Sequence, residues 1–180
     1  MAELIVEYGT GVANANSYLS IDEFVDFAEL LGYDPEIIPQ ERLEKRMMRA
    51  TLIIDSRYRD DFPGKRATFE QGLEWPRVDA YYVDYYPIDV DVVPKEIKMA
   101  LVETVFLLEQ GRNLQPVVEK QGAIAMERVK ADVIEEEVRY HSEAERMTEI
   151  YTVVEDVLSR ITGGMSSRYD IKIIRVGGCG

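Results

Sequence analysis

Hydrophobic positions in residues 93–111 recur every three or four residues, a spacing typical of an α-helix with one wide apolar face. Pro94 suits the start of a helix, where an N–H would have no partner, and Gly111 suits the left-handed residue that ends one. The pattern therefore predicts the central helix of the core between these two residues. Its inward positions are Ile97, Ala100, Leu101, Thr104, Val105 and Leu108.

Three other stretches show helical periodicity, and two of them begin with a capping box, SIDE at Ser20 and SEAE at Ser142. We predict helices from Ser20 to about residue 32, from Gln40 to Tyr58, and from Ser142 to the glycines at 163 and 164. Their apolar faces are Ile21, Phe24, Val25, Ala28 and Leu31; then Leu43, Met47, Ala50, Ile54 and Tyr58; then Ile150, Val153, Val154, Val157, Leu158 and Ile161.

β-favouring residues occur in three places. Residues 4–6 suit an edge strand, residues 117–133 suit a small antiparallel sheet or hairpin turning near Gly122, and residues 169–180 suit a strand in a tail. Such a tail favours docking onto a neighbour by strand addition through Ile171, Ile173, Ile174 and Val176. We expect a mainly α fold with a small β element (α+β), with about four helices in one domain, residues 1–165, and a C-terminal tail, residues 166–180.

The chain is acidic, with a formal net charge of −13 over 180 residues and 46% hydrophobic residues. This size and composition allow a sizeable core in a single domain. The charge disfavours nucleic-acid binding, which depends on Lys and Arg contacts to phosphate, although a local basic patch remains compatible with it. No apolar run approaches the length of a membrane span, so we expect a soluble protein without a membrane partner.

The sequence shows no recognisable catalytic or metal-binding chemistry. A lone histidine, His141, and a lone cysteine, Cys179, cannot form a histidine-pair or multi-cysteine metal site. The pair Asp89 and Asp91 lacks the other spaced oxygen ligands and the glycine of an EF-hand loop, and no phosphate-binding glycine motif is present. We therefore expect neither an enzyme nor a bound cofactor.

Two surfaces are candidates for partner contacts. The first is a basic stripe on the second helix, formed by Arg42, Lys45, Arg46 and Arg49. Such a stripe can be a solvated face, a subunit contact or a nucleic-acid contact. An acidic run, Glu135, Glu136 and Glu137 together with Asp132, offers the opposite charge, and we predict that it pairs with the stripe across a subunit boundary.

The second surface lies in residues 61–92, which have no sustained helical period and are unusually long for a connection. Trp75 precedes a proline and is more typical of an anchor to the core than of a partner contact. The tyrosines Tyr81, Tyr82, Tyr85 and Tyr86 follow, interleaved with aspartates. Stacking platforms for single strands lie in positively charged grooves, so we interpret these tyrosines as a protein-contact surface, with ordinary loop packing as the alternative.

Four segments carry a resemblance to a known family: ANSYLSIDEF, ATLIIDSRYR from Ala50 to Arg59, GKRATFEQGLEWPR ending at Arg77, and VPKEIKMALVE. They resemble phage and prophage head–tail connector (adaptor, head-completion) proteins, which are often labelled DnaT-like single-stranded DNA-binding proteins. The similarity spans about residues 13–163, and its most specific part is the spacing from N-S-Y-L through Y-R to W-P-R. None of these is a catalytic motif.

The resemblance implies a helical, homo-oligomeric subunit, commonly in a twelvefold ring beneath the portal protein and above a tail or tail-completion protein. Double-stranded DNA would pass through the lumen without specific binding. The protein would then belong to the virion and would occupy the host cytoplasm during assembly. The alternative implied by the label is a DnaT-like accessory protein that binds single-stranded DNA.

Overall fold

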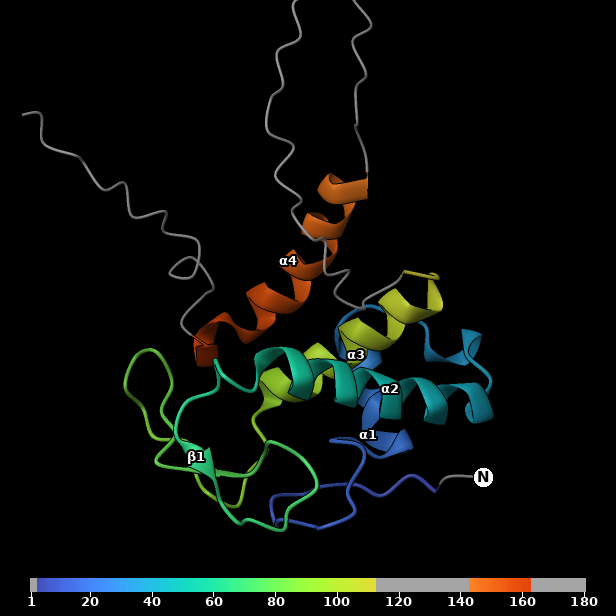
Figure 1. Cartoon of the computed structure of the whole chain (residues 1–180). Helices are drawn as coiled ribbons and strands as arrows, with labels where there is room; N and C mark the ends of the chain where they lie inside the picture. The colour runs from blue at the N-terminus through green and yellow to red at the C-terminus, as the bar shows by residue number, and fades with distance from the viewer. Residues whose placement is uncertain (1–2, 113–142, 163–180) are drawn as a thin grey trace, which may run out of the picture.

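A computed structural model describes residues 3–112 and 143–162, and these form a mainly helical fold with a very small sheet (Figure 1). The elements in chain order are α1 (Ile21–Leu30), the 3₁₀-helix η1 (Pro35–Ile37), α2 (Gln40–Tyr58), β1 (Lys65–Arg66), β2 (Arg77–Val78), α3 (Lys95–Glu109) and α4 (Glu143–Thr162). The predicted class, about four helices with a small antiparallel sheet, is confirmed. The proposed tail, residues 166–180, lies outside the described residues.

Helix α1 begins and ends where its sequence predicts. The Ser20 hydroxyl accepts a hydrogen bond from the Glu23 N–H at 3.2 Å, and the Glu23 carboxylate accepts one from the Ser20 N–H at 3.0 Å, which completes the capping box. Phe24 and Ala28 are buried. Beyond the helix, Gly32 takes a φ of +83°, a left-handed conformation that glycine adopts without a steric cost.

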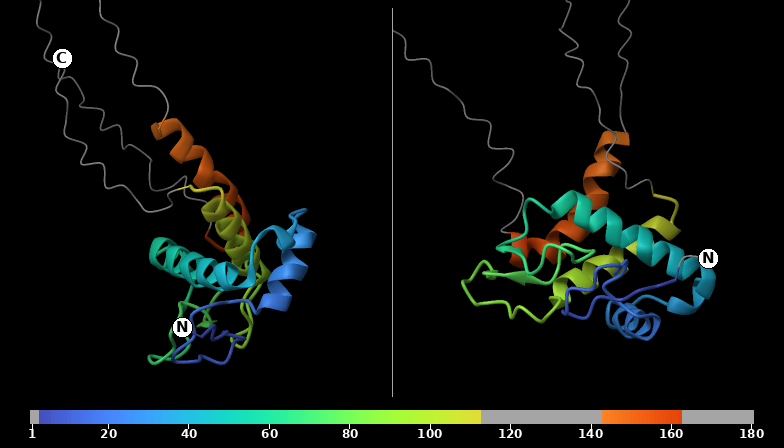
Figure 2. Two further views of the ribbon diagram at one scale, coloured as in Figure 1. Left: turned by 90° about the vertical axis from the view of Figure 1, so that its right-hand side faces the viewer. Right: turned by 60° about the horizontal axis from the view of Figure 1, so that its bottom comes forward.

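Helix α3 is the central helix, as predicted, because α1, α2 and α4 all pack against it (Figure 2). Every position of its predicted apolar face is buried, and so are Val102 and Phe106 outside that face. Helix α2 contributes the predicted side chains Leu43, Met47, Ala50, Ile54 and Tyr58 to the same core. Pro94 is the residue that precedes α3, and Gly111 after it has a φ of +75°.

Helix α4 runs antiparallel to α3, since Arg160 near its C-terminal end lies 3.5 Å from Glu96 in the first turn of α3. Val154, Leu158 and Ile161 are buried, but Val153 is 44% exposed. The buried stripe of the described part of α4 is therefore narrower than the predicted one. No helix in the described ranges is long and apolar enough to cross a membrane.

The sheet lies in the segment that the periodicity indicates as a loop. Lys65 pairs with Val78 and Arg66 with Arg77 in two antiparallel strands. The predicted sheet at residues 117–133 lies outside the described residues. The predicted edge strand at residues 4–6 is wrong: only one isolated parallel bridge, Val6 to Ser17, forms there, because the Asn16 side chain rather than a second strand accepts from the Ile5 N–H at 2.8 Å.

Candidate interaction site

Three of the four segments that carry the family resemblance meet in a buried polar network at α2. The Tyr18 hydroxyl donates to Asp55 Oδ1 at 2.5 Å, and the Glu74 N–H donates to Asp55 Oδ2 at 3.0 Å. The Trp75 N–H donates to the Tyr18 oxygen at 3.3 Å. Burial raises the pKa of Asp55 to about 6 and holds that of Tyr18 well above its usual value. N-S-Y-L, the end of α2 and W-P-R are thus joined by hydrogen bonds.

Arg77 and Gly72 extend this network into the backbone. The buried Arg77 guanidinium donates to the carbonyls of Pro63 at 2.8 Å and Gly64 at 3.0 Å, and it lies 3.0 Å from the Glu74 carboxylate. At Gly72 an added Cβ would lie 2.7 Å from the carbonyl oxygen of Ala13, so only glycine fits this close approach. The resemblance therefore marks residues that build the fold.

A second buried carboxylate, Glu7, organises the N-terminal loop. Its two oxygens accept hydrogen bonds from the N–H groups of Gly9, Thr10, Gly11 and Val12 at 2.6–3.0 Å. Four amide donors compensate the desolvation of this charge. Sequence reasoning missed Glu7, because it belongs to no periodic pattern, and included Tyr18 in the N-S-Y-L segment without predicting its buried hydrogen bond to Asp55.

Residues 81–86, called here the tyrosine loop, form a narrow turn at the end of the helical core. The Tyr82 N–H donates to the Tyr86 carbonyl at 2.9 Å, and the Tyr85 N–H donates to the Tyr82 carbonyl at 2.9 Å. Tyr85 is 86% exposed and Tyr86 68% exposed, while Tyr81 and Val83 are about half exposed. Three of the four predicted tyrosines therefore lie on the surface together.

The fourth tyrosine fixes the loop to α3 and α4. The Tyr82 hydroxyl lies 3.4 Å from the buried Glu96 carboxylate, and the Arg160 guanidinium lies 5.4 Å from the centre of the Tyr82 ring. Burial, followed by the nearby Glu96 charge, raises the pKa of Tyr82. The Val83 N–H also donates to the Arg160 carbonyl at 2.9 Å. The exposed tyrosines are thus presented on an anchored scaffold.

The basic stripe contacts carboxylates of its own chain. Arg42 and Arg46 converge on Glu109, at 2.7 Å and 3.3 Å, and fasten α2 to the last turn of α3. Lys45 pairs with Glu41 one turn earlier on α2, at 2.8 Å, and Arg49 is half-buried. The acidic run at Glu135, Glu136 and Glu137 lies outside the described residues, as do Ile171, Ile173, Ile174 and Val176. The predicted pairing between subunits stays a prediction.

Another basic and aromatic surface lies at β1. The sequence alone did not single it out. It consists of Lys65, Arg66 and Phe69, called here the β1 patch, on a shallow hollow that continues to Arg77. Phe69 is 95% exposed. Lys65 lies 3.6 Å from Asp79, and Arg66 donates to the backbone carbonyls of Phe69 and Gln71. The signal for this patch was the text GKRATF between α2 and Trp75.

Within residues 3–112 and 143–162, no group of three or more His, Cys, Asp or Glu side chains is arranged to hold a metal ion. His141 and Cys179 lie outside those ranges.

Comparison with known proteins gives one family. A family model described as "Putative DnaT-like ssDNA binding protein" matches residues 2–176. No curated protein and no solved structure matches the chain. The match covers nearly the whole of the sequence, including the segments that form the buried network.

Proposed function

We propose that this chain, which belongs to the DnaT-like family, is a structural subunit of a ring-shaped head–tail connector, a role that goes beyond the family description. In this role copies of the chain, twelve in the expected ring, lie between the portal protein and a tail or tail-completion protein. Double-stranded DNA passes through the lumen without specific binding. The resemblance of the four sequence segments to connector proteins supports this assignment.

The tyrosine loop is the observation that carries the proposal. Tyr81, Val83, Tyr85 and Tyr86 gather exposed aromatic and aliphatic surface in one place, and tyrosine is enriched in protein interfaces. Hydrogen bonds to α3 and α4 hold the loop in position, which reduces the entropy lost on binding. An anchored, exposed apolar loop suits contact with a protein partner.

The charge of the chain also supports the connector role. The net charge of −13 repels phosphate, and basic side chains such as Arg42, Arg46 and Lys98 lie against carboxylates of the same chain. A passage through which DNA must slide gains nothing from basic side chains that hold phosphates. The surface thus fits a channel subunit better than a protein whose main activity is to grip DNA.

The mass of the purified protein, measured by sedimentation velocity alone and with portal protein, tests this proposal. We expect species much larger than the 20.6 kDa chain, either with increasing concentration or on addition of portal. A protein that stays at the mass of one chain in both conditions would contradict it.

Single-stranded DNA binding is the second candidate, and the family description supports it directly. The β1 patch supplies what it requires, an exposed aromatic ring beside cationic side chains. The test is a salt titration of the protein with a labelled oligothymidylate. Submicromolar affinity near physiological salt with a steep salt dependence, lost in Phe69→Ala, would establish this function in place of the connector.

A further inference from the structure

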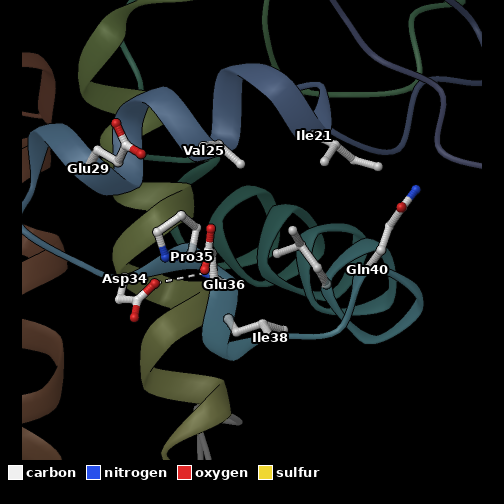
Figure 3. Close-up of a pocket in the computed structure, with 9 residues that line it drawn as sticks. Ile21, Val25, Glu29, Asp34, Pro35, Glu36, Ile38 and Gln40 are labelled. Carbon is white, nitrogen blue, oxygen red and sulfur yellow. Dashed lines mark hydrogen bonds between the residues drawn. The ribbon is translucent and has the colours of Figure 1, made fainter.

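An open groove with an apolar floor lies where α1 and η1 meet the start of α2 (Figure 3). Ile21 and Val25 line it from α1, and Ile38 and Leu43 line it from the opposite side. Ile38 and Leu43 are buried beneath the groove, while Ile21 and Val25 are partly exposed along it. The floor can therefore receive the apolar side chains of another segment.

The rim of this groove is acidic. Glu29, Asp34 and Glu36 line it, and all three are exposed (Figure 3). The Asp34 carboxylate accepts the Glu36 N–H at 3.0 Å, but among the described residues none of the three carboxylates has a basic side chain within ion-pair distance. A segment that is both apolar and positively charged would therefore complement the apolar floor and the acidic rim of the groove.

The sequence of this acidic chain contains such a segment. Residues 168–176, RYDIKIIRV, combine four branched aliphatic side chains with Arg168, Lys172 and Arg175 against one acidic residue, Asp170. The segment lies outside the described residues, so only its sequence enters the argument. Its charge and its isoleucines match the rim and the floor of the groove.

The groove and the end of α4 lie at opposite ends of the helical core. At the groove end, Arg42 of α2 pairs with Glu109 in the last turn of α3. At the other end, Arg160 of α4 pairs with Glu96 in the first turn of α3. Figure 1 shows α2 running from one end to the other, and its 19 residues span about 28 Å at 1.5 Å per residue.

Reach therefore disfavours docking within one chain. From Thr162 to Ile171 the chain advances nine residues, which span at most about 30 Å when fully extended. To dock in the groove of its own chain, the segment would need the residues that follow Thr162 to be almost fully extended along the side of the helical bundle. A neighbouring copy placed head to tail removes this requirement.

We propose that the acidic-rimmed groove binds residues 168–176 of a second copy of this chain. The groove and the segment are different surfaces of the chain, so the contact is heterologous and can repeat until a ring closes. The proposal rests on the ring function proposed above and identifies the contact that would join each subunit to the next.

A peptide of residues 167–176 with a fluorescent label tests the contact directly. It is titrated with the full chain carrying Lys172→Glu and Arg175→Glu, which weakens competition from the chain's own segment. We expect saturable binding that Glu29→Lys with Glu36→Lys, added to that chain, weakens at least about tenfold by turning attraction into repulsion. The matched control, Asp22→Lys with Asp26→Lys, reverses two exposed charges of α1 that do not line the groove and should change affinity less than about twofold.

Sedimentation of the same variants separates this inference from the ring proposal. Loss of large species in Glu29→Lys with Glu36→Lys, and their recovery when Lys172→Glu with Arg175→Glu is added, supports the contact. If large species persist in Glu29→Lys with Glu36→Lys, or if the peptide does not bind, the contact is overturned. Either result leaves the ring proposal itself unaffected.

A wild-type protein that stays at the mass of one chain, both alone and with portal protein, gives two further outcomes. If it binds the peptide as well as the tail variant does, the ring proposal fails while the contact between chains stands. If it excludes the peptide that the tail variant binds, the segment occupies its own groove and the second-copy inference is overturned.

Discussion

Residues 71–77 and the tyrosine loop, residues 81–86, belong to one connection between α2 and α3 but have opposite surroundings. Trp75 is fully buried, and its ring meets the ring of Phe62 edge-on at 5.8 Å. Tyr85, ten residues later, is 86% exposed. In the first stretch, side-chain and backbone groups are tied to α2 and the N-terminal loop. In the second, the Tyr82 side chain and the Val83 N–H hold the loop to α3 and α4, while the side chains of Tyr81, Tyr85 and Tyr86 stay exposed. Similar aromatic content thus serves the fold in one stretch and is available to partners in the other.

The largest effect should come from removing the buried ring. Trp75→Ala deletes a fully buried side chain and leaves a cavity, so the free energy of unfolding should fall by about 3–5 kcal/mol in urea denaturation. Trp75→Phe keeps much of the apolar volume and should cost clearly less. A loss below about 1 kcal/mol for the alanine variant would show that this half of the connection does not hold the fold.

Asp55→Asn should change the pH dependence of stability. Burial raises the pKa of Asp55 from 3.8 to about 6, so the folded chain holds this proton more tightly than the unfolded chain. This contribution to stability is present below about pH 4 and is lost as pH rises through about 6.

Relative to Asp55→Asn, the wild type should therefore lose up to about 3 kcal/mol across that window, since one pKa unit corresponds to about 1.4 kcal/mol. Above about pH 7 the difference should be constant. Urea denaturation of both proteins across this pH range measures it. If the stabilities of the two proteins changed in parallel with pH, the pKa of Asp55 would not be raised in the folded chain.

Glu109→Gln tests whether the basic stripe belongs to the fold. The substitution keeps the shape but removes the charge that Arg42 and Arg46 share, and partly exposed ion pairs contribute about 0–1 kcal/mol each. We expect stability to fall by about 1 kcal/mol, with a smaller loss at high salt. Glu41→Gln, which affects only the exposed pair with Lys45, is the matched control and should cost less. Equal losses of stability in the two variants would indicate that the basic stripe is only a solvated face.

The smallest effect on stability should come from the tyrosine loop. Tyr85→Ser with Tyr86→Ser alters exposed side chains and should change the free energy of unfolding by less than about 0.5 kcal/mol. Self-association should nevertheless weaken, because buried tyrosines in interfaces can each contribute more than about 1 kcal/mol. Phe69→Ser, an equally exposed aromatic residue at the β1 patch, should leave association unchanged. Equal loss in both variants would remove the special role of the loop.

Helix positions were predictable because their signals are local. The capping box at Ser20, the proline before α3 and the glycine after it set helix ends through neighbouring residues alone. The bounds of α2 followed from its apolar spacing. Burial around α3 exceeded the predicted face, because periodicity does not reveal how many partners surround a helix.

The polar network and the sheet were not predictable because they depend on long-range geometry. Tyr18 and Asp55 are 37 positions apart and carry no motif that joins them. Strands β1 and β2 have two residues each, too few for an alternating pattern. The Arg77 guanidinium of β2 binds the carbonyls of Pro63 and Gly64, directly before β1, and this contact has no sequence signal. Of the candidate surfaces, the sequence predicted the tyrosines but could not show that Tyr82 is an anchor or that Arg42 and Arg46 share Glu109.

Sedimentation velocity of the wild-type protein mixed with a fluorescent oligothymidylate, followed at separate wavelengths for protein and label, tests the central claim most directly. The account predicts that the protein, at high concentration or with portal protein added, sediments near physiological salt as species several times larger than 20.6 kDa while the label remains at the position of free oligonucleotide. Label that sediments with single 20.6 kDa chains would contradict it, and would assign the exposed surfaces to single-stranded DNA.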